Sequence, residues 1–248
     1  HAVFCGPRYR IDGSAFDHRL VTGEATGANT EWFDAVPAEA PVPVTRPANR
    51  YGIAPDRLLA PAMLPHAIDH AFRAARCRWA ATLRAGAGDS TAAPGELDRD
   101  ARVLADPALA DAHLTARASE FAAGARPLEI PRDSEYLVLL ELETYYCAYP
   151  ELVTRGGAGA CVELGWAESL YEEREGRLVK GDRREIEGKL FTGDFDLFRP
   201  GGRDEEFFTT PWWRSGRYLL LRIRTGSDPL ELCALSFRET RQPVELAA

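Results

Sequence analysis

The sequence predicts a mainly β protein built around an antiparallel β-sandwich, with a partial N-terminal β region and a short helical insertion. From residue 128 onward, apolar and polar residues alternate in several short runs, which is the period of a strand that turns one face to a core. The turn sequences GGAG, PGG and GSDP separate these runs, as in sandwiches of short antiparallel strands.

The composition is that of an ordinary globular chain. At 248 residues with 45% hydrophobic content, it can bury a substantial core. A net charge of −8 argues against nucleic-acid or anionic membrane partners. The chain shows no apolar run of about 18 residues and no charged-then-apolar leader, so we expect neither a membrane span nor a secretion signal. It opens at His1 without a methionine, which raises the hypothesis that the natural N-terminus is missing.

The five cysteines lie far apart and include no CxxC pair. That pattern does not have the spacing of a zinc knuckle or a redox motif. Reduced thiols in a cytoplasmic protein are the expectation that fits this usage.

We expect three segments along the chain. Residues 1–66 are rich in Pro, Gly and Ala and are predicted to be a partial β domain or linker remnant, in which APVPVTRP forms an edge or tether. Residues 67–127 are predicted to be a connecting segment with a loose loop over 85–96, a strand around RCRWAATL and two short helices separated near Pro107, the second ending at Gly124. Residues 128–248 are the predicted sandwich domain.

Within the sandwich, the alternation predicts half-buried strands. The residues expected on the inner faces are Tyr136, Val138, Leu140, Leu142, Val162, Leu164, Trp166, Phe191, Phe195, Leu197, Leu219, Leu221 and Ile223. Thr192, Asp194 and Asp196 fall on the opposite side of their strand.

The motif HAIDH places His66 and His70 four residues apart, which on a helix presents two imidazoles to one metal, with Asp69 beside them. The motif lacks the glutamate of a metalloprotease, and Pro65 leaves room for only a short helix. We therefore favour two partly exposed histidines and predict no metal site. Asp194 and Asp196 could hold calcium, but a polar outer face is the simpler interpretation.

Catalytic arrangements are not evident. No histidine follows His113, so the second half has no Ser-His-Asp or Cys-His pair of its own. RGGAGA lacks a following helix to direct at an anion and is interpreted as a hairpin turn. The acidic runs AESLYEEREGR and REIEGK are interpreted as solvated faces rather than an acid/base pair. We predict no catalytic residue and no cofactor.

The pair Trp212 and Trp213 precedes the strand-like run RYLLLRIR. Adjacent strand residues point to opposite faces, so we expect one ring in the core and the other at an interface or sugar surface. An unbroken strand would also turn Arg217 inward, so a bulge near RSG is predicted.

Three ordered blocks carry a family resemblance: LELETYYCAYPELVTRGGAGACVELGWAESLYEE, KGDRREIEGKLFTGDFDLFRPGG and EEFFTTPWWRSGRYLLLRIRTGSDPL. Over about residues 128–243, they resemble the β-sandwich that precedes the catalytic domain of bacterial α-L-rhamnosidases. APDRLLAPAMLP resembles the linker after the first β domain of such proteins.

The resemblance implies a concanavalin-like or jelly-roll sandwich in a cytoplasmic glycoside hydrolase of carbohydrate metabolism. It also implies that this chain alone is not an enzyme, because the chemistry of that family lies in an (α/α)6 barrel after the sandwich. No residue here matches the motifs of the barrel. The implied partner is that C-terminal catalytic domain.

A sandwich that lies against a barrel needs exposed aromatic surface, with arginines to pair across the seam. The candidate interface or carbohydrate-binding residues are Tyr145, Tyr146, Tyr149, Trp212, Trp213, Arg214 and Arg217. The alternative hypothesis is a carbohydrate-binding module for rhamnose-containing glycans, in which an exposed ring stacks on the sugar. A free-standing hydrolase that uses the acid clusters is a third.

Overall fold

The computed structural model describes residues 9–14, 67–74, 76–83 and 102–243. HAVFC, EWFDAV, APVPVTRP, the loop over 85–96, the linker-like APDRLLAPAMLP and His66 lie outside these residues.

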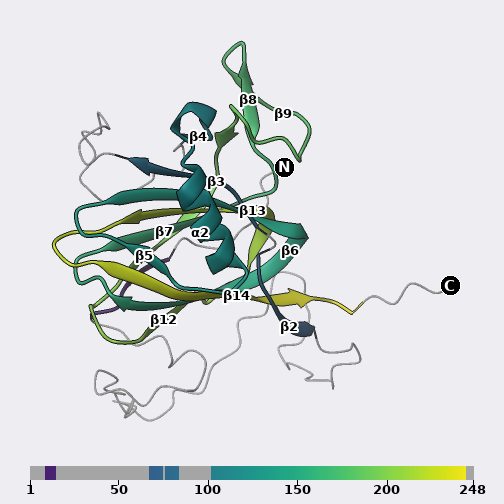
Figure 1. The fold of residues 1–248 in the computed structure, drawn as a ribbon. Helices are drawn as coiled ribbons and strands as arrows, with labels where there is room; N and C mark the ends of the chain where they lie inside the picture. Colours follow the sequence, from purple (N-terminus) through teal and green to yellow (C-terminus); the bar gives the residue numbers. More distant parts are fainter. Residues whose placement is uncertain (1–8, 15–66, 75, 84–101, 244–248) are drawn as a thin grey trace, which may run out of the picture.

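The described chain is mainly β, as predicted, and forms a curled mixed sheet with one α-helix among the described elements (Figure 1). Its first elements are β1 (Arg10–Asp12), β2 (Ile68–Phe72), β3 (Arg76–Leu83), β4 (Val103–Leu104), the 3-10 helix η1 (Pro107–Leu109), α2 (Ala112–Ala122), β5 (Leu128–Ile130), β6 (Glu135–Gly156) and β7 (Cys161–Ala167). They are followed by β8 (Tyr171–Arg174), β9 (Arg177–Lys180), β10 (Leu190–Phe191), β11 (Asp194–Arg199), β12 (Glu206–Thr209), β13 (Arg214–Arg224) and β14 (Leu230–Arg241).

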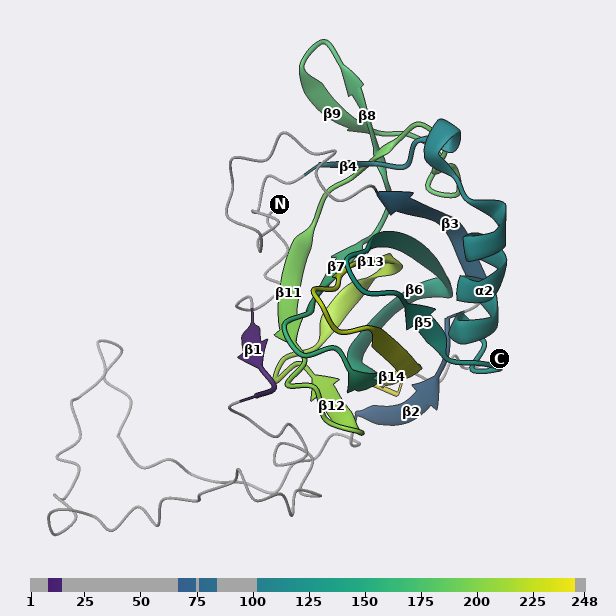
Figure 2. The same ribbon diagram turned by 60° about the vertical axis from the view of Figure 1, so that its left-hand side comes forward.

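The 22-residue strand β6 organises the sheet. Its first part pairs with β3 on one side and β13 on the other, and β7, β11 and β1 continue beyond β13. Its last part pairs with β12 and β14, and β14 in turn carries β5 and β2. The sheet therefore folds back on itself along one strand, which gives a sandwich-like body around a common interior (Figure 2). The pairs are antiparallel except β1 with β11, which is parallel.

The main core lies inside this curl, and we call it the inner cluster. It contains Tyr136, Val138, Leu140 and Leu142 from β6, the alternating residues of β7 and β13, and Leu230, Leu232, Leu235 and Phe237 from β14. The prediction that these residues share an inward face is confirmed for β6, β7 and β13. In β11, Phe195 and Leu197 are buried outside this cluster, whereas Phe198 belongs to it.

A second core, the outer cluster, lies on the opposite face of the same strands. Leu137, Leu139 and Leu220 pack there with Trp79 and with Leu170, Ile186, Phe191 and Phe195 from the segment that follows β7. The prediction of half-buried strands is therefore wrong for β6 and β7, since β7 is buried at all of its positions. Polar residues at 141 and 163 gave the appearance of a solvated face, but the chain between β7 and β11 covers that face.

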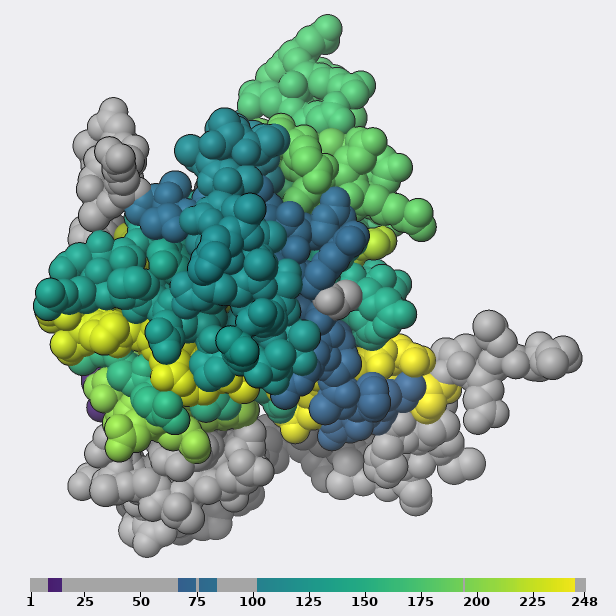
Figure 3. Space-filling view, in the orientation of Figure 1, coloured from purple at the N-terminus to yellow at the C-terminus, as the bar shows by residue number. Residues whose placement is uncertain are grey.

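The helical insertion follows its predicted signals. The 3-10 helix η1 begins at Pro107, and Asp111 caps α2 by accepting a hydrogen bond from Leu114 N at 2.9 Å. Gly124 ends the helix in the left-handed region at φ 74°, where its N–H bonds Phe121 O at 2.8 Å. The helix packs on β3 and adds Leu114, Ala118 and Phe121 to the inner cluster, and it lies in the middle of the face shown in Figure 3.

Two local expectations are corrected. Residues 68–70 of HAIDH form the first part of strand β2, which pairs with β14, so the short helix considered for this motif does not form over those residues. RGGAGA turns the chain with Gly156, Gly157 and Gly159 at positive φ, but it is not a hairpin, because β13 lies between β6 and β7. Strand β3 forms over Arg76–Leu83, as predicted. It joins the sheet of residues 128–243, and the proposed boundaries at 66/67 and 127/128 stay a prediction.

A small sheet of β4, β10, β8 and β9 completes the described structure. The hairpin β8–β9, closed by Glu175 and Gly176 at positive φ, projects from the body in both ribbon views (Figures 1 and 2). Among the described elements, none is a helix long and apolar enough to cross a membrane.

Candidate functional site

The fold brings the predicted site residues to one region, where β6 bends. Gly216, Ser215 and Arg214 of β13 pair with Tyr146, Cys147 and Ala148 of β6. Trp212 and Trp213 precede β13 and therefore reach the same region. We call the five rings Tyr145, Tyr146, Tyr149, Trp212 and Trp213 the aromatic segment.

The rings of the aromatic segment differ in exposure. Tyr145 is 46% exposed and Trp212 is 40% exposed. Tyr146 packs inward and stacks on Phe72, with ring centroids 4.1 Å apart. Tyr149 is half-buried, with the Arg238 guanidinium carbon 5.6 Å from its ring centroid. Two of the rings thus present aromatic surface to solvent.

The expectation that one tryptophan lies in the core is wrong. Trp213 is only partly buried, and the two indoles stack on each other with centroids 6.3 Å apart and planes at 30°. Trp212 lies in a bend and both tryptophans precede β13, which begins at Arg214, so the alternation of strand faces does not apply to them. A hydrogen bond at 2.8 Å from Thr210 Oγ1 to Trp212 O holds this bend.

Arg214 is not available to pair across a domain seam as predicted. It is 2% exposed, and its guanidinium binds Asp196 through Nε to Oδ2 at 2.7 Å and Nη2 to Oδ1 at 2.6 Å. Asp196 is fully buried and also accepts the N–H of Tyr9 at 2.9 Å. The expectation that Asp196 lies on a polar outer face is wrong, because it neutralises Arg214, and the same contacts argue against a calcium ligand.

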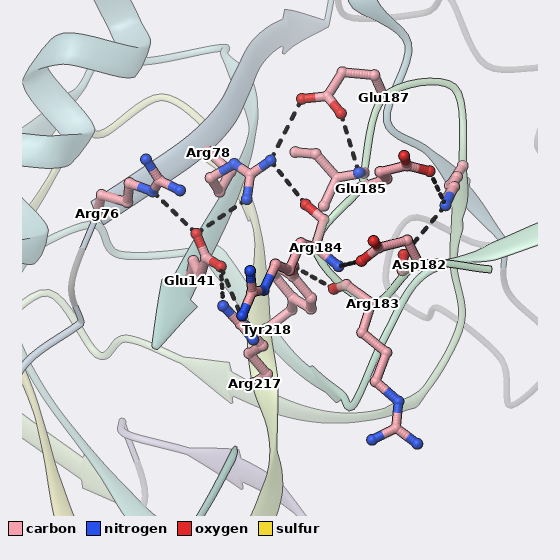
Figure 4. Close-up of polar contacts among 12 residues, drawn as sticks. Arg76, Arg78, Glu141, Asp182, Arg183, Arg184, Glu185, Glu187, Arg217 and Tyr218 are labelled. Atoms are coloured by element: carbon pink, nitrogen blue, oxygen red, sulfur yellow. Dashed lines mark hydrogen bonds and ion pairs between the residues drawn. The ribbon is translucent and has the colours of Figure 1, made fainter. Parts of the chain in front are cut away.

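Arg217, the last predicted site residue, belongs to a cluster that sequence reasoning missed. Glu141 is 4% exposed, and three arginines converge on its carboxylate (Figure 4). Its Oε2 accepts Arg76 Nε and Arg78 Nη1, both at 3.0 Å. Its Oε1 accepts Arg217 Nε at 3.1 Å and Nη2 at 2.8 Å. We call these four residues the Glu141 hub.

Two β-bulges build the hub. The register of β3 against β6 shifts between Cys77 and Trp79, and the register of β13 against β6 shifts between Gly216 and Tyr218. On β3 the extra residue is Arg78, whereas on the other side the extra residues are 142–145 of β6, which lie opposite Arg217 alone. A bulge redirects a side chain at the expense of ladder hydrogen bonds. An irregularity thus lies on each side of β6 next to an arginine that reaches the same carboxylate. The irregularity predicted near RSG is confirmed, but its inserted residues belong to β6.

The hub also ties down the loop over residues 182–187, which we call the strap. Arg78 Nη2 donates to Arg184 O at 3.0 Å and reaches Glu187 Oε1 at 3.5 Å. The buried Tyr218 donates its hydroxyl to Arg183 O at 2.7 Å. Ile186 of the strap lies in the outer cluster, so these bonds hold the cover over that core.

The electrostatics of the hub follow from these contacts. Burial raises the pKa of Glu141, but hydrogen bonds from Arg78, Arg76 and Arg217 outweigh burial and leave that pKa below its usual value. Burial lowers the pKa of Arg78, and its bond to Glu141 more than reverses that effect. The pKa of the Tyr218 hydroxyl is raised, first by burial and then by the nearby Glu141 charge. The Glu141 carboxylate, ionised at neutral pH, therefore faces three guanidinium groups, so the hub holds more positive than negative charge.

Other hollows of the described surface lie elsewhere. A pocket of ≈ 480 Å³ lies between β5, the end of β6 and the start of β14, where Arg155 pairs with Glu231 at 3.1 Å. No predicted site residue lines it. Among the described residues, no group of three or more His, Cys, Asp or Glu side chains could hold a metal ion.

Sequence reasoning therefore found Arg217 and the aromatic segment but missed Arg76, Arg78 and Glu141. The available signal was weak. Glu141 follows Leu137 and Leu139 on one face of β6, and RCRW places two arginines beside a tryptophan. Only the strand pairing brings these residues together.

Comparison with known proteins does not assign the chain to a family. No family model and no curated protein matches the chain. Among solved structures, the chain is similar to a GH78 family rhamnosidase of Bacillus sp. GL1, with 19% identity and a TM-score of 0.36. The match covers 48% of this chain and 11% of that protein. At this TM-score, the likeness decides nothing about function.

Proposed function

We propose that the chain is a non-catalytic accessory β-sandwich region of an α-L-rhamnosidase-like glycoside hydrolase, and that its aromatic segment docks onto the catalytic domain. The ordered blocks over residues 128–243 support the family. The observation that carries docking is the exposure of Tyr145 and Trp212 in one region of a chain whose other large aromatic side chains are largely buried or half-buried where described.

Tyrosine and tryptophan favour this role physically. Each buries on the order of 150–250 Å² when enclosed, and both are enriched at the centres of interfaces between proteins. The stacked Trp212 and Trp213 hold each other in place, which lowers the conformational entropy lost on docking. Tyr145 belongs to the exposed part of β6, over residues 143–145, so its ring is accessible to a partner.

The test begins with the reading frame beyond Ala248. The proposal expects a helical domain with acidic motifs there, which would be produced separately and titrated against this chain by calorimetry. Tyr145→Ala and Trp212→Ala should each weaken association by about tenfold. Leu109→Ala is the matched control, because Leu109 is 50% exposed on η1, away from the aromatic segment. The absence of such a domain, or equal weakening by the control, would refute docking.

The same observation bears on the second candidate, a carbohydrate-binding module. An exposed indole can stack on a sugar face. Saturable binding of L-rhamnose that is lost in Trp212→Ala or Trp213→Ala would favour the module over the docking surface. Hydrolysis of an aryl rhamnoside by this polypeptide alone would contradict both.

A further inference from the structure

The Glu141 hub carries an excess of positive charge. Three guanidinium groups surround one carboxylate, and among the described residues the only other acid that contacts them is Glu187, at 3.5 Å from Arg78. Glu187 is 64% exposed, so water screens its charge. Glu143, the next residue along that face of β6, forms no ion pair with the three arginines in the described structure. In a chain of net charge −8, this is a local reversal of sign.

The excess charge is held at close quarters. Arg76 Nε and Arg78 Nη1 each lie 3.0 Å from the same oxygen, so the two nitrogens are within about 6 Å of each other. Like charges at that separation repel, and the repulsion grows as burial lowers the local dielectric. Arg78 and Arg217 are only 15% and 24% exposed. A second anion would relieve the repulsion that one carboxylate leaves.

Donors for a second anion are present. Arg76 is 61% exposed and uses only Nε, which donates to Glu141. Within the described chain, its two terminal nitrogens have no hydrogen-bond partner. A guanidinium offers parallel N–H groups that match two oxygens of a carboxylate, sulfate or phosphate.

The hub also contains more arginines than a structural ion pair with Glu141 requires. One cross-strand arginine, Arg76, already faces Glu141 in the ladder. Two further arginines reach it at the places where the ladder is irregular on either side of β6. Bulges are frequent beside binding sites because they redirect side chains.

We propose that the Glu141 hub is a binding site for an oxyanion. The exposed Arg76 donates hydrogen bonds to the anion, and the positive charges of the more buried Arg78 and Arg217 attract it. The ligand class is a small sulfate or phosphate, or the carboxylate of a larger ligand. This site lies beyond the proposed docking role and does not depend on it.

The experiment measures the thermal stability of the protein against millimolar sodium sulfate, phosphate and acetate, with chloride holding the ionic strength constant. A ligand that binds the folded state raises the melting temperature in a saturable way. Arg76→Gln should weaken the apparent affinity by about tenfold or more, because a charged donor pair is lost. Arg126→Gln is the matched control, since Arg126 is 78% exposed and its ion pair is with Glu120 rather than Glu141.

Glu141→Gln gives an independent test. With the internal carboxylate neutralised, the arginines lack their anion, and added sulfate should stabilise this variant more than the unmodified protein. A response to acetate would indicate a carboxylate-bearing ligand, and a response to sulfate and phosphate alone would indicate a tetrahedral anion. The proposal is overturned if no anion gives a saturable effect, or if Arg76→Gln responds as Arg126→Gln does.

Discussion

Strand β13 contributes an arginine to each of two arginine–carboxylate sites, and the two sites differ in how completely their charges are matched. At the start of the strand, Arg214 meets Asp196 in a bidentate pair, and both side chains are almost entirely buried. Three residues further along, Arg217 joins Arg76 and Arg78 around Glu141, and the exposure of these arginines ranges from 15% to 61%. The first site is closed and neutral, whereas the second is open and positively charged.

This difference in charge matching and exposure determines what each site can do. In a buried pair, the donors and acceptors bind each other and not a ligand. Removing either partner leaves an unpaired charge in the core. A half-exposed cluster with surplus guanidinium groups tolerates the loss of one and retains donors for an incoming anion. The closed pair therefore belongs to stability and the open hub to binding.

Arg214→Met tests the closed pair and should have the largest effect. The substitution leaves Asp196 buried without its cation, at a cost of about 3–5 kcal/mol in the free energy of unfolding. Urea denaturation measures this loss. Arg155→Met, which removes a 57% exposed partner of Glu231, is the control and should cost less than about 1 kcal/mol. Similar losses in the two variants would mean that the Asp196 pair is not closed.

Glu141→Gln should have the next largest effect. It removes the only carboxylate that three arginines share, but those arginines are partly solvated, so the loss is discounted to about 2–3 kcal/mol. Glu231→Gln, which removes the acid of an exposed pair, serves as the control in the same urea experiment. If Glu141→Gln unfolds no more easily than the control, the hub contributes nothing to the fold.

Acid should erase the difference between Glu141 and its glutamine variant. The pKa of Glu141 is lower in the folded protein than the usual 4.5, so the folded state binds fewer protons than the unfolded state near that pH. The stabilisation is therefore present above about pH 4.5 and is lost as the pH falls through the lowered pKa. Urea midpoints measured from pH 7 down to pH 3 should converge for the two proteins. A constant gap over this range would contradict the assignment.

Arg76→Gln should have the smallest effect on stability, below about 1 kcal/mol, because the side chain is 61% exposed. Its consequence should instead be the loss of the response to anions. A large loss of stability in urea would place Arg76 with Arg214 as a structural residue and would remove the contrast between the two sites.

Part of this architecture could be predicted from the sequence. Alternation identified the β-rich half and the inward residues of β6, β7 and β13, since that pattern is local. Gly124 and Pro107 marked the helical insertion for the same reason. The burial of both faces of β6 could not be predicted, because the cover comes from residues between β7 and β11 that are distant in sequence from β6.

The candidate site was predicted only in part. The aromatic residues stood out by type, but Trp212 and Trp213 were assigned to a strand that begins at Arg214. The Glu141 hub lies at two shifts of register, and such irregularities leave almost no mark on composition. Arg214 was expected at a surface because its partner Asp196 is 18 residues away on β11.

The most direct measurement is an NMR titration with sulfate that follows the Nε–H signals of the arginine side chains in one sample. If the Glu141 hub binds the anion and the Arg214–Asp196 pair does not, saturable shifts are expected at Arg76, Arg78 and Arg217. The signal of Arg214 should stay unchanged and serves as the internal reference. Shifts of equal size at Arg214 and the hub, or no shift at Arg76, would contradict anion binding at the hub.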